Sequence, residues 1–254
     1  MRFIIKFFVI FLVTYNSVAR ETGQTEITAE DGIEVFQEEK YYLLKKNVRI
    51  ESDNFNLFGD NIKIYFEKDL YDIKKIDAKG NVKLISNTNN VEANGNELKF
   101  YTNEEEIFLS GIGSKLITNG TTMISDGYIN VKNLLGEFVL NGANSKLETQ
   151  DIIIEGSFIE GFFRPESNIN EILKIEVKDE KLAYVKSEDT EMYANIIKYN
   201  KETSLIELSE NVKIIDEGEI ITGDYGQINT QTNSYKMNSN DSKKVKVVIS
   251  NKNE

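Results

Sequence analysis

Apolar and polar side chains alternate with a period of two along most of the chain after residue 26, and this pattern constrains the fold more than any other feature. Side chains on a β-strand point to opposite faces in turn, so each such segment has one apolar and one polar face. The alternation therefore predicts an all-β protein. It is clearest at five pairs of apolar residues: Val48 and Ile50, Ile62 and Ile64, Val82 and Leu84, Leu98 and Phe100, and Ile129 and Val131.

Two short phrases recur within this pattern. The first occurs as DNIKIY, GNELKF and ANIIKY, with looser copies in DGYINV and DYGQIN. The second occurs as KNVRI, GNVKL, GIGSKL, GANSKL and ENVKI, and its Gly80, Gly111 and Gly142 are 31 residues apart. We interpret each phrase as the start of a strand, with Gly, Asn or Asp forming the turn that ends the strand before it. One repeat then comprises two strands and two turns.

The segments between the phrases are short, as at residues 87–90 (NTNN), 103–106 (NEEE) and 119–120 (NG). Such connections suit antiparallel hairpins, because parallel neighbours need crossovers of about a dozen residues. The pattern favours a long antiparallel meander that folds over itself, and a parallel β-helix remains the alternative.

The repeat is interrupted once, at residues 161–173 (GFFRPESNINEIL), which contain the only proline, Pro165. We interpret this segment as an irregular connection. It would separate a β block at residues 20–160 from further β repeats at 174–250, with a short tail at 251–254.

Composition excludes several classes of chemistry. The chain has no cysteine and no histidine, so it cannot contain disulfides, a thiol nucleophile, an imidazole base or a Cys/His zinc site. Its formal net charge of −12 argues against a nucleic-acid partner, because phosphate binding depends on lysine and arginine. No residue pattern indicates a cofactor.

The first residues have the layout of a secretory signal peptide. Arg2 and Lys6 precede or interrupt an apolar run that ends before the small-x-small triplet Ser17-Val18-Ala19. We expect residues 1–19 to be removed by cleavage after Ala19 and the mature protein to reach the periplasm. A retained inner-membrane anchor is the alternative, although the run is shorter than the roughly 20 apolar residues of a spanning helix.

In this context the chain resembles the OstA/LptA family of periplasmic lipopolysaccharide-transport proteins. The resemblance rests on the order and spacing of ITAEDGIEVF, KKNVRIES, LFGDNIKIYF, IDAKGNVKLIS and VEANGNELKFY, and a weaker echo runs over residues 191–228. It implies a twisted antiparallel β-jellyroll of the OstA-like type, open at both ends, whose interior holds acyl chains. It also implies head-to-tail assembly into a bridge between the inner and outer membranes. The chain departs from compact family members in its length and in the interruption at 161–173.

The resemblance gives the apolar face a role. A folded sheet with apolar residues inside forms a slot in which lipid tails gain about 0.8 kcal/mol per buried CH₂ group. The expected lipid-binding residues are the ten apolar residues named above, and we expect no catalytic or metal-binding residues. The alternative is that the same side chains pack on each other as a closed core. The lysines at 243, 244 and 246 could meet lipid phosphates but more often protect an edge strand.

Carboxylates recur at one position of the first phrase, as Asp60, Asp126 and Asp224. A stack of acids in a β-solenoid could bind calcium or cleave polysaccharide. Gly95 and Ala194 occupy the same position without a carboxylate, so a turn residue explains the position better. An exported β-helical carbohydrate-active enzyme and a structural or adhesive β-solenoid therefore remain the alternatives to a lipid-carrying, non-catalytic bridge.

The ends of such a sheet are expected to bind other chains. Unpaired edges near residues 27–35 and 243–249 would be templates for the edge strands of other transport proteins or of a second copy. Glu26, Glu30, Asp31 and Glu34 would give the first edge an acidic character that complements the C-terminal lysines. Contact between the last strand of one copy and the first of the next would propagate head to tail.

Overall fold

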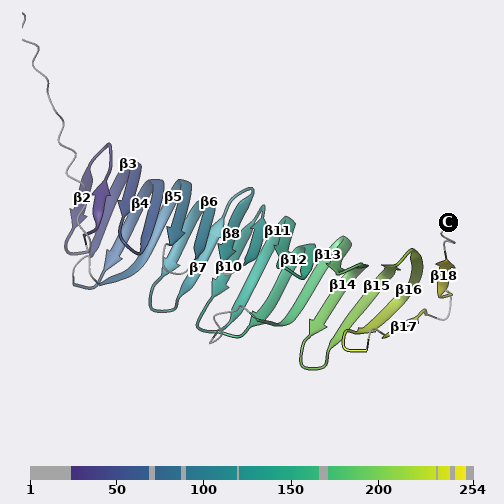
Figure 1. Cartoon of the computed structure of the whole chain (residues 1–254). Coiled ribbons are helices and arrows are strands. Elements are labelled where there is room, and N and C mark those ends of the chain that lie inside the picture. The colour runs from purple at the N-terminus through teal and green to yellow at the C-terminus, as the bar shows by residue number, and fades with distance from the viewer. Residues whose placement is uncertain are drawn as a thin grey trace, which may run out of the picture.

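The computed structural model describes residues 24–249, apart from 69–71, 87–89, 119, 166–170, 233 and 241–243. All regular structure in the described residues is β-strand, as the alternation predicted. The expected signal peptide and the tail at 251–254 lie outside the described residues. Figure 1 shows the strands side by side in chain order, from the N-terminal edge at one end of a long axis to the C-terminal edge at the other.

The first ten strands are β1 (Glu26–Thr28), β2 (Ile33–Phe36), β3 (Tyr41–Glu51), β4 (Phe55–Phe66), β5 (Ile73–Ser86), β6 (Val91–Tyr101), β7 (Glu106–Ser110), β8 (Ser114–Thr118), β9 (Thr121–Ser125) and β10 (Tyr128–Lys132). The others are β11 (Glu137–Glu148), β12 (Ile152–Phe163), β13 (Ile172–Ser187), β14 (Thr190–Asn200), β15 (Leu205–Asp216), β16 (Glu219–Asn229), β17 (Ser234–Asn238) and β18 (Lys246–Ile249).

The strands form one antiparallel meander. Every pairing among the described strands is antiparallel, and each long strand pairs with the strands before and after it. The β-helix alternative is therefore wrong, because its neighbouring strands would run parallel. The short strands are halves of bent strands: β1 and β2 both pair with β3, and β17 and β18 both pair with β16. In the same way β7 with β8, and β9 with β10, each form one bent strand.

The recurring phrases mark kinks within strands. The pairing shifts register between Lys45 and Val48 in β3, and between Lys79 and Val82 in β5. At the β5 kink, Gly80 and Asn81 both have positive φ, at 74° and 49°. Our expectation that each phrase begins a strand was therefore wrong for phrases such as GNVKL, whereas β8 and β10 do begin within GIGSKL and DGYINV. Glycine and asparagine supply left-handed backbone at a bulge as readily as at a turn, and here they bend a strand that continues beyond them.

Side chains bridge neighbouring kinks in a polar ladder. Asn81 Nδ2 donates to Asp60 Oδ2 at 2.9 Å, and Asn211 Nδ2 donates to Asn195 Oδ1 at 2.7 Å. Asp126 accepts from the Gly113 backbone N–H at 2.9 Å and from Asn144. The aspartates of the first phrase thus hold the backbone at bends, close to the turn role that we expected for them.

The kinks divide the folded sheet into two arms. Arm A contains β2, β7, β10, β17 and the halves of the long strands that pair with them; arm B contains β1, β8, β9, β18 and their partner halves. One cluster of buried apolar residues includes members of both arms, such as Leu44 and Leu98 from arm A and Val48 and Leu57 from arm B. The result is a two-layered, jellyroll-like sheet folded along its kinks.

The repeat interruption is smaller than we expected. Strand β12 continues through Phe163 and β13 begins at Ile172, so the connection comprises residues 164–171 rather than 161–173. The two strands pair along their length, from the Phe163–Ile172 pair to the Ile152–Ser187 pair. The sheet is therefore continuous across the interruption, while the division of the chain into two blocks stays a prediction. The residue 103–106 tip lies at a hairpin, with Glu106 opening β7.

Candidate functional site

The inward faces of the arms form continuous rows of apolar side chains along the whole molecule. In arm A, cross-strand pairing joins Ile33 to Leu44, Leu44 to Ile62, and so on to Met237 in β17. In arm B, a matching row runs from Ile27 to Val247. Each bent strand thus contributes to both walls of one interior.

All ten residues expected to bind lipid face this interior. Eight of them are buried, from Ile62 and Ile129 at 0% exposure to Val131 at 8%. Leu84 and Phe100 lie nearer the strand ends and are partly buried against the same cluster. The lysines between them, Lys63, Lys83 and Lys99, are not buried, so the structure confirms the alternation at these positions. Their role in binding lipid stays a prediction, and in this structure the inward side chains pack on one another.

Sequence reasoning missed much of the interior and its open side. Leu44, Leu109, Leu116 and Leu140 are as deeply buried as the ten, and the same alternation could have identified them. At the hairpin ends of the two arms, which we call the mouth, larger side chains pack partly buried against the core: Tyr42, Phe55, Ile73, Ile107, Ile152 and Tyr199. Apart from Tyr199, which ends the phrase ANIIKY, no recurring phrase marks these residues, because each lies close to the end of a strand.

The interior is open at both ends of the sheet. Ile33 and Val35 in β2 belong to the inward rows but are 48% and 46% exposed. Tyr235 in β17 and Val247 in β18 continue the inward rows at the other end and are 43% and 51% exposed. These side chains are exposed because no described strand lies beyond them, which confirms the expectation of open ends.

The acidic N-terminal edge is partly neutralised within the chain. Glu34 pairs with Lys45 at 2.6 Å, and Lys46 pairs with Glu30 at 3.1 Å. The hydrogen bond from Asn47, together with that from Lys46, lowers the pKa of the Glu30 carboxyl. The hydrogen bond to Glu30 and the charge of Asp31 raise the pKa of Lys46. The edge therefore offers a partner less free negative charge than the sequence indicated.

The C-terminal edge carries exposed lysines. Lys246 in β18 and the preceding Lys244 are exposed. Lys243 lies outside the described residues.

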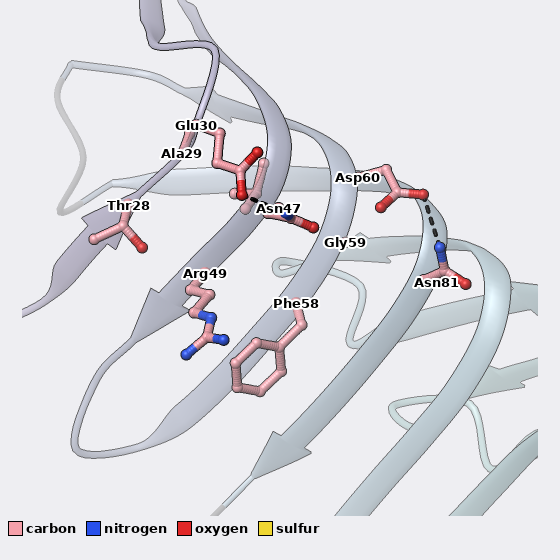
Figure 2. Close-up of a pocket in the computed structure, with 10 residues that line it drawn as sticks. Thr28, Ala29, Glu30, Asn47, Arg49, Phe58, Gly59, Asp60 and Asn81 are labelled. Carbon is pink, nitrogen blue, oxygen red and sulfur yellow. Dashed lines mark hydrogen bonds between the residues drawn. The ribbon is translucent and has the colours of Figure 1, made fainter.

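A groove of about 530 Å³ lies on the outer face of arm B beside the N-terminal edge. Figure 2 shows Arg49 and Phe58 side by side on neighbouring strands, with the guanidinium carbon 5.9 Å from the ring centroid. Thr28 lies on one side of this pair, and the hydrogen-bonded Asp60 and Asn81 lie on the other side. The groove could hold a polar group against Arg49.

A second groove, of about 430 Å³, crosses the outer face of arm A over β12 to β15. Its walls combine apolar Phe162 and Leu205 with Lys174, Lys198 and Glu207. Phe162 is exposed at this surface. Its lining is mixed in charge, so it indicates no single ligand chemistry.

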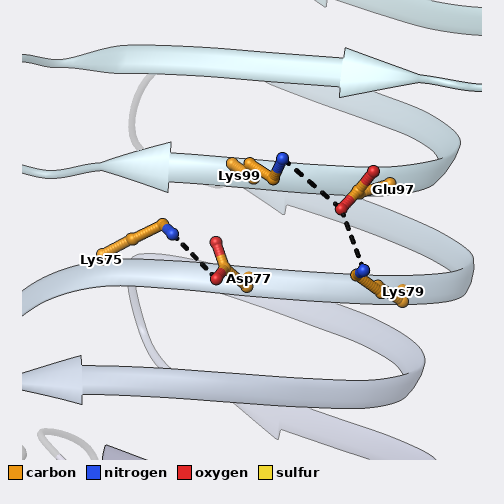
Figure 3. Close-up of polar contacts among 5 residues, drawn as sticks. All are labelled: Lys75, Asp77, Lys79, Glu97 and Lys99. Carbon is orange, nitrogen blue, oxygen red and sulfur yellow. Dashed lines mark hydrogen bonds and ion pairs between the residues drawn. The ribbon is translucent and has the colours of Figure 1, made fainter.

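The outer face of arm A is a network of paired charges at its N-terminal end. Figure 3 shows Lys75 paired with Asp77 at 2.8 Å, and Glu97 between Lys79 and Lys99 at 3.3 and 3.6 Å. Burial acts to lower the pKa of Lys75, but the hydrogen bond and charge of Asp77 outweigh it and raise that pKa. Lys79 and Glu97 face each other across strands, whereas the other two pairs join residues two apart on one strand. Such exposed pairs of opposite charge stabilise a sheet only modestly.

The described residues contain no cluster of three acidic, cysteine or histidine side chains suited to a metal ion. Asp60 and Asp126 accept hydrogen bonds at separate kinks, and Asp224 accepts one from the Asn240 backbone N–H at 3.0 Å. Each aspartate thus has a structural partner at its own bend. No helix in the described part of the chain has the length and apolar character needed to cross a bilayer.

Comparison with known proteins supports the resemblance over the first part of the chain. Residues 26–134 match the family model described as LptA/(LptD N-terminal domain) LPS transport protein, which covers less than half of the chain. No curated protein matches the sequence. Among solved structures, the chain is similar to LptH from Pseudomonas aeruginosa, described as the LptA homologous periplasmic component of a lipopolysaccharide transport device. The two share 15% identity over 51% of this chain and 94% of that one, with a TM-score of 0.43.

Proposed function

We propose that the chain is a non-catalytic periplasmic carrier of lipopolysaccharide, in which acyl chains lie between the two arms on the way to the outer membrane. The observation that carries the proposal is the pair of inward apolar rows, which cross every bent strand and emerge exposed at both edges. The match of residues 26–134 to a family of lipopolysaccharide-transport proteins supports it.

The closed packing of the interior is compatible with this cargo on energetic grounds. An acyl chain that enters at the mouth replaces contacts between the arms with contacts of the same apolar kind, so little dispersion energy is lost. The acyl chain itself leaves water and gains about 0.8 kcal/mol per CH₂ group. Partly buried side chains such as Phe100 and Ile107 are the first to separate, because they have the fewest neighbours to lose.

Site-specific crosslinking tests the proposal. A photo-crosslinking residue at Leu98 or Phe100 should capture lipopolysaccharide, and one at the outward Lys99 between them should not. Phe100→Asp should reduce capture more than Lys99→Asp, because an unpaired charge is costly against acyl chains. Equal labelling of both faces would refute the inward site.

We further propose that the two open edges bind neighbouring chains of the transport system or a second copy. The described residues form fourteen bent strands, an even number, so the last of them would run antiparallel to the first strand of a following copy. Continuing the observed register would place Met237 opposite Ile33, Tyr235 opposite Val35, and Lys236 opposite Glu34 of the next copy. Apolar residues then meet in the interior, and opposite charges meet outside.

One second function has a specific observation in its favour. Inward side chains at or near 0% exposure are also what a structural or adhesive β-repeat protein with a permanently closed core would show. The two functions differ in whether the arms separate for a lipid. A chain whose Leu98 position captures no lipid, while its two arms stay at a fixed distance, would be assigned the structural role.

A further inference from the structure

The lysine of the second recurring phrase forms a line across the outer face of arm B. Cross-strand pairing places the basic residue of all five copies in one register row, which Lys246 of β18 extends at the C-terminal edge. This basic row consists of Arg49, Lys83, Lys115, Lys146, Lys213 and Lys246. One residue from an intervening strand separates neighbouring cations, except between Lys146 and Lys213, where there are three. Adjacent strands lie about 4.8 Å apart, so cations on every second strand recur roughly every 10 Å along the molecule.

The residues between these cations are mostly neutral. The intervening strands contribute Phe58, Asn94, Ile124, Glu155, Tyr184, Tyr193 and Thr222 to the row. Glu155 is the single carboxylate among them, in a chain that has 42 acidic and 30 basic side chains. Every second strand contributes a cation to the row, except that β13 contributes the neutral Tyr184.

The equivalent outer row of arm A provides an internal comparison. It runs through Leu43 and carries lysines at 63, 99, 198 and 236, but its other positions include Glu34, Asp77, Glu160, Glu176 and Glu207. Opposite charges in that row neutralise each other, for example Glu176 with Lys198 at 3.4 Å. A second outer row of arm A contains Lys45, Lys79 and Lys178, but each of these lysines is paired with a carboxylate, at 2.6, 3.3 and 2.8 Å. The basic row of arm B differs from both because several of its cations have no such partner among the described residues.

Several cations of the basic row are free to bind a ligand. Among the described residues, no carboxylate lies within 4.0 Å of Arg49, Lys115 or Lys213. Lys83 has one distant partner, Glu92 at 3.9 Å, and only Lys146 has a close one, Glu148 at 3.0 Å.

Aromatic rings lie beside the free cations. Arg49 stacks over Phe58 at 5.9 Å, and Lys213 over Tyr193 at 5.2 Å. Tyr193 in turn contacts Tyr184, with ring centroids 5.1 Å apart. Two of the three free cations, Arg49 and Lys213, thus combine positive charge with a flat apolar surface.

Carboxylates lie on both sides of the basic row and favour a ligand that is no wider than the row itself. On the mouth side the parallel outer row contains Glu51, Glu92, Glu148 and Glu191, and on the kink side lie Glu30, Asp60 and Asp126. A flat anionic bilayer would cover these carboxylates as well as the basic row, and its headgroups would be repelled by them. A single linear polyanion can lie along the row and avoid them.

We propose that the basic row binds a linear anionic saccharide, carrying carboxylates or phosphates, that lies along the long axis of the molecule. Its acidic groups meet Arg49, Lys115 and Lys213, and its sugar rings cover Phe58 and Tyr193. This site lies on the outer face of arm B and is separate from the proposed lipid slot in the interior. The saccharide part of a lipid cargo and a free polysaccharide share this chemistry.

Binding of a labelled oligogalacturonate of about ten units tests the proposal, with a neutral maltooligosaccharide of equal length as the ligand control. The test variant is Arg49→Gln/Lys115→Gln/Lys213→Gln. The matched control is Lys63→Gln/Lys99→Gln/Lys198→Gln, which removes the same charge from the outer face of arm A. Circular dichroism verifies that both variants keep the β fold.

The wild-type protein should bind oligogalacturonate, with an affinity that falls as salt rises, and should ignore the neutral oligosaccharide. The basic-row variant should lose roughly tenfold in affinity, since three exposed ion pairs contribute a few-fold each. The arm A variant should lose less than twofold. No binding by the wild type, or an equal loss in both variants, would overturn the proposal, as would stronger binding to anionic vesicles than to the saccharide.

A second probe, the delipidated saccharide of lipopolysaccharide, separates the two sources. If the basic-row variant weakens its binding as well, the sugars of the lipid cargo are the occupant; if only oligogalacturonate responds, the occupant is a free polysaccharide. Lipid capture at Leu98 should persist in the basic-row variant. A failure of the interior slot is thus distinguishable from a failure of the basic row.

Discussion

Replacing Gly80 by alanine should destabilise the protein through two effects at one kink. Gly80 has φ of +74°, and a Cβ added there would lie 2.3 Å from Asp60 Oδ2 and 2.9 Å from Asp60 Cβ. The Asp60 side chain would have to move, and it would then lose the hydrogen bond that it accepts from Asn81 at 2.9 Å. The substitution therefore combines backbone strain with the loss of one contact in the polar ladder.

The two effects add to about 1.5–3.5 kcal/mol. Left-handed backbone costs a residue with a Cβ about 1–2 kcal/mol, and a hydrogen bond of this type contributes about 0.5–1.5 kcal/mol. Gly218 provides the matched control, because it has φ of +92° in a hairpin and nothing within 4 Å of an added Cβ. Gly218→Ala should show the strain alone, about 1–2 kcal/mol.

Urea unfolding followed by circular dichroism measures both free energies of unfolding on the mature chain. Gly80→Ala should lower the free energy by roughly 1 kcal/mol more than Gly218→Ala. In an Asp60→Ala background the hydrogen bond and the 2.3 Å contact with Oδ2 are absent, and only the 2.9 Å contact with Cβ remains, so the excess should become smaller. Equal effects of the two glycine substitutions in the wild-type background would refute the coupling between neighbouring kinks.

Three further predictions concern export, assembly and pH. Mass spectrometry of the periplasmic fraction should find a mature chain that begins after Ala19, whereas an intact N-terminus in membranes would contradict export by cleavage. Truncation after Asp241 should leave a folded protein that no longer self-associates, and concentration-dependent light scattering that persists would place the contact elsewhere. The hydrogen bond from Lys178 lowers the pKa of Glu176, so the stability that this carboxylate contributes is present above its unfolded pKa and is lost as pH falls through the lower folded value. Urea midpoints should therefore fall between pH 6 and pH 3 by a smaller amount in Glu176→Gln, and an unchanged pH dependence would exclude this carboxylate as a contributor.

The alternation at positions such as Ile62 and Ile64 was sufficient to predict strands and inward faces, and the short connections between strands predicted an antiparallel sheet. The sequence was ambiguous where Gly80 and Asn81 meet, because one left-handed pair of residues can end a strand or bend it. Only the pairing of both halves of β5 with β6 distinguishes these outcomes. Alternation therefore predicted the faces of the sheet, and it could not predict where the sheet folds.

The sequence predicted which side chains of the candidate site face inward, but it could not predict whether the interior is open or closed. Leu98 and Ile129 show the same apolar pattern whether they pack on each other or line a slot for lipid, so no pattern distinguishes a closed interior from an open one. The basic row was visible as the lysine of a recurring phrase. Its arrangement depends on cross-strand register, which places Lys115 beside Asn94 and Ile124 and which the sequence does not encode locally.

The distance between the two arms tests the central claim most directly. The chain has no cysteine, so Lys99→Cys on the outer face of arm A and Lys83→Cys on that of arm B provide a unique pair of spin-label sites. Pulsed electron resonance should show the label distance increasing, by about the width of an acyl chain, when lipopolysaccharide is added. An unchanged distance in protein that has demonstrably bound the lipid would contradict a cargo held between the arms.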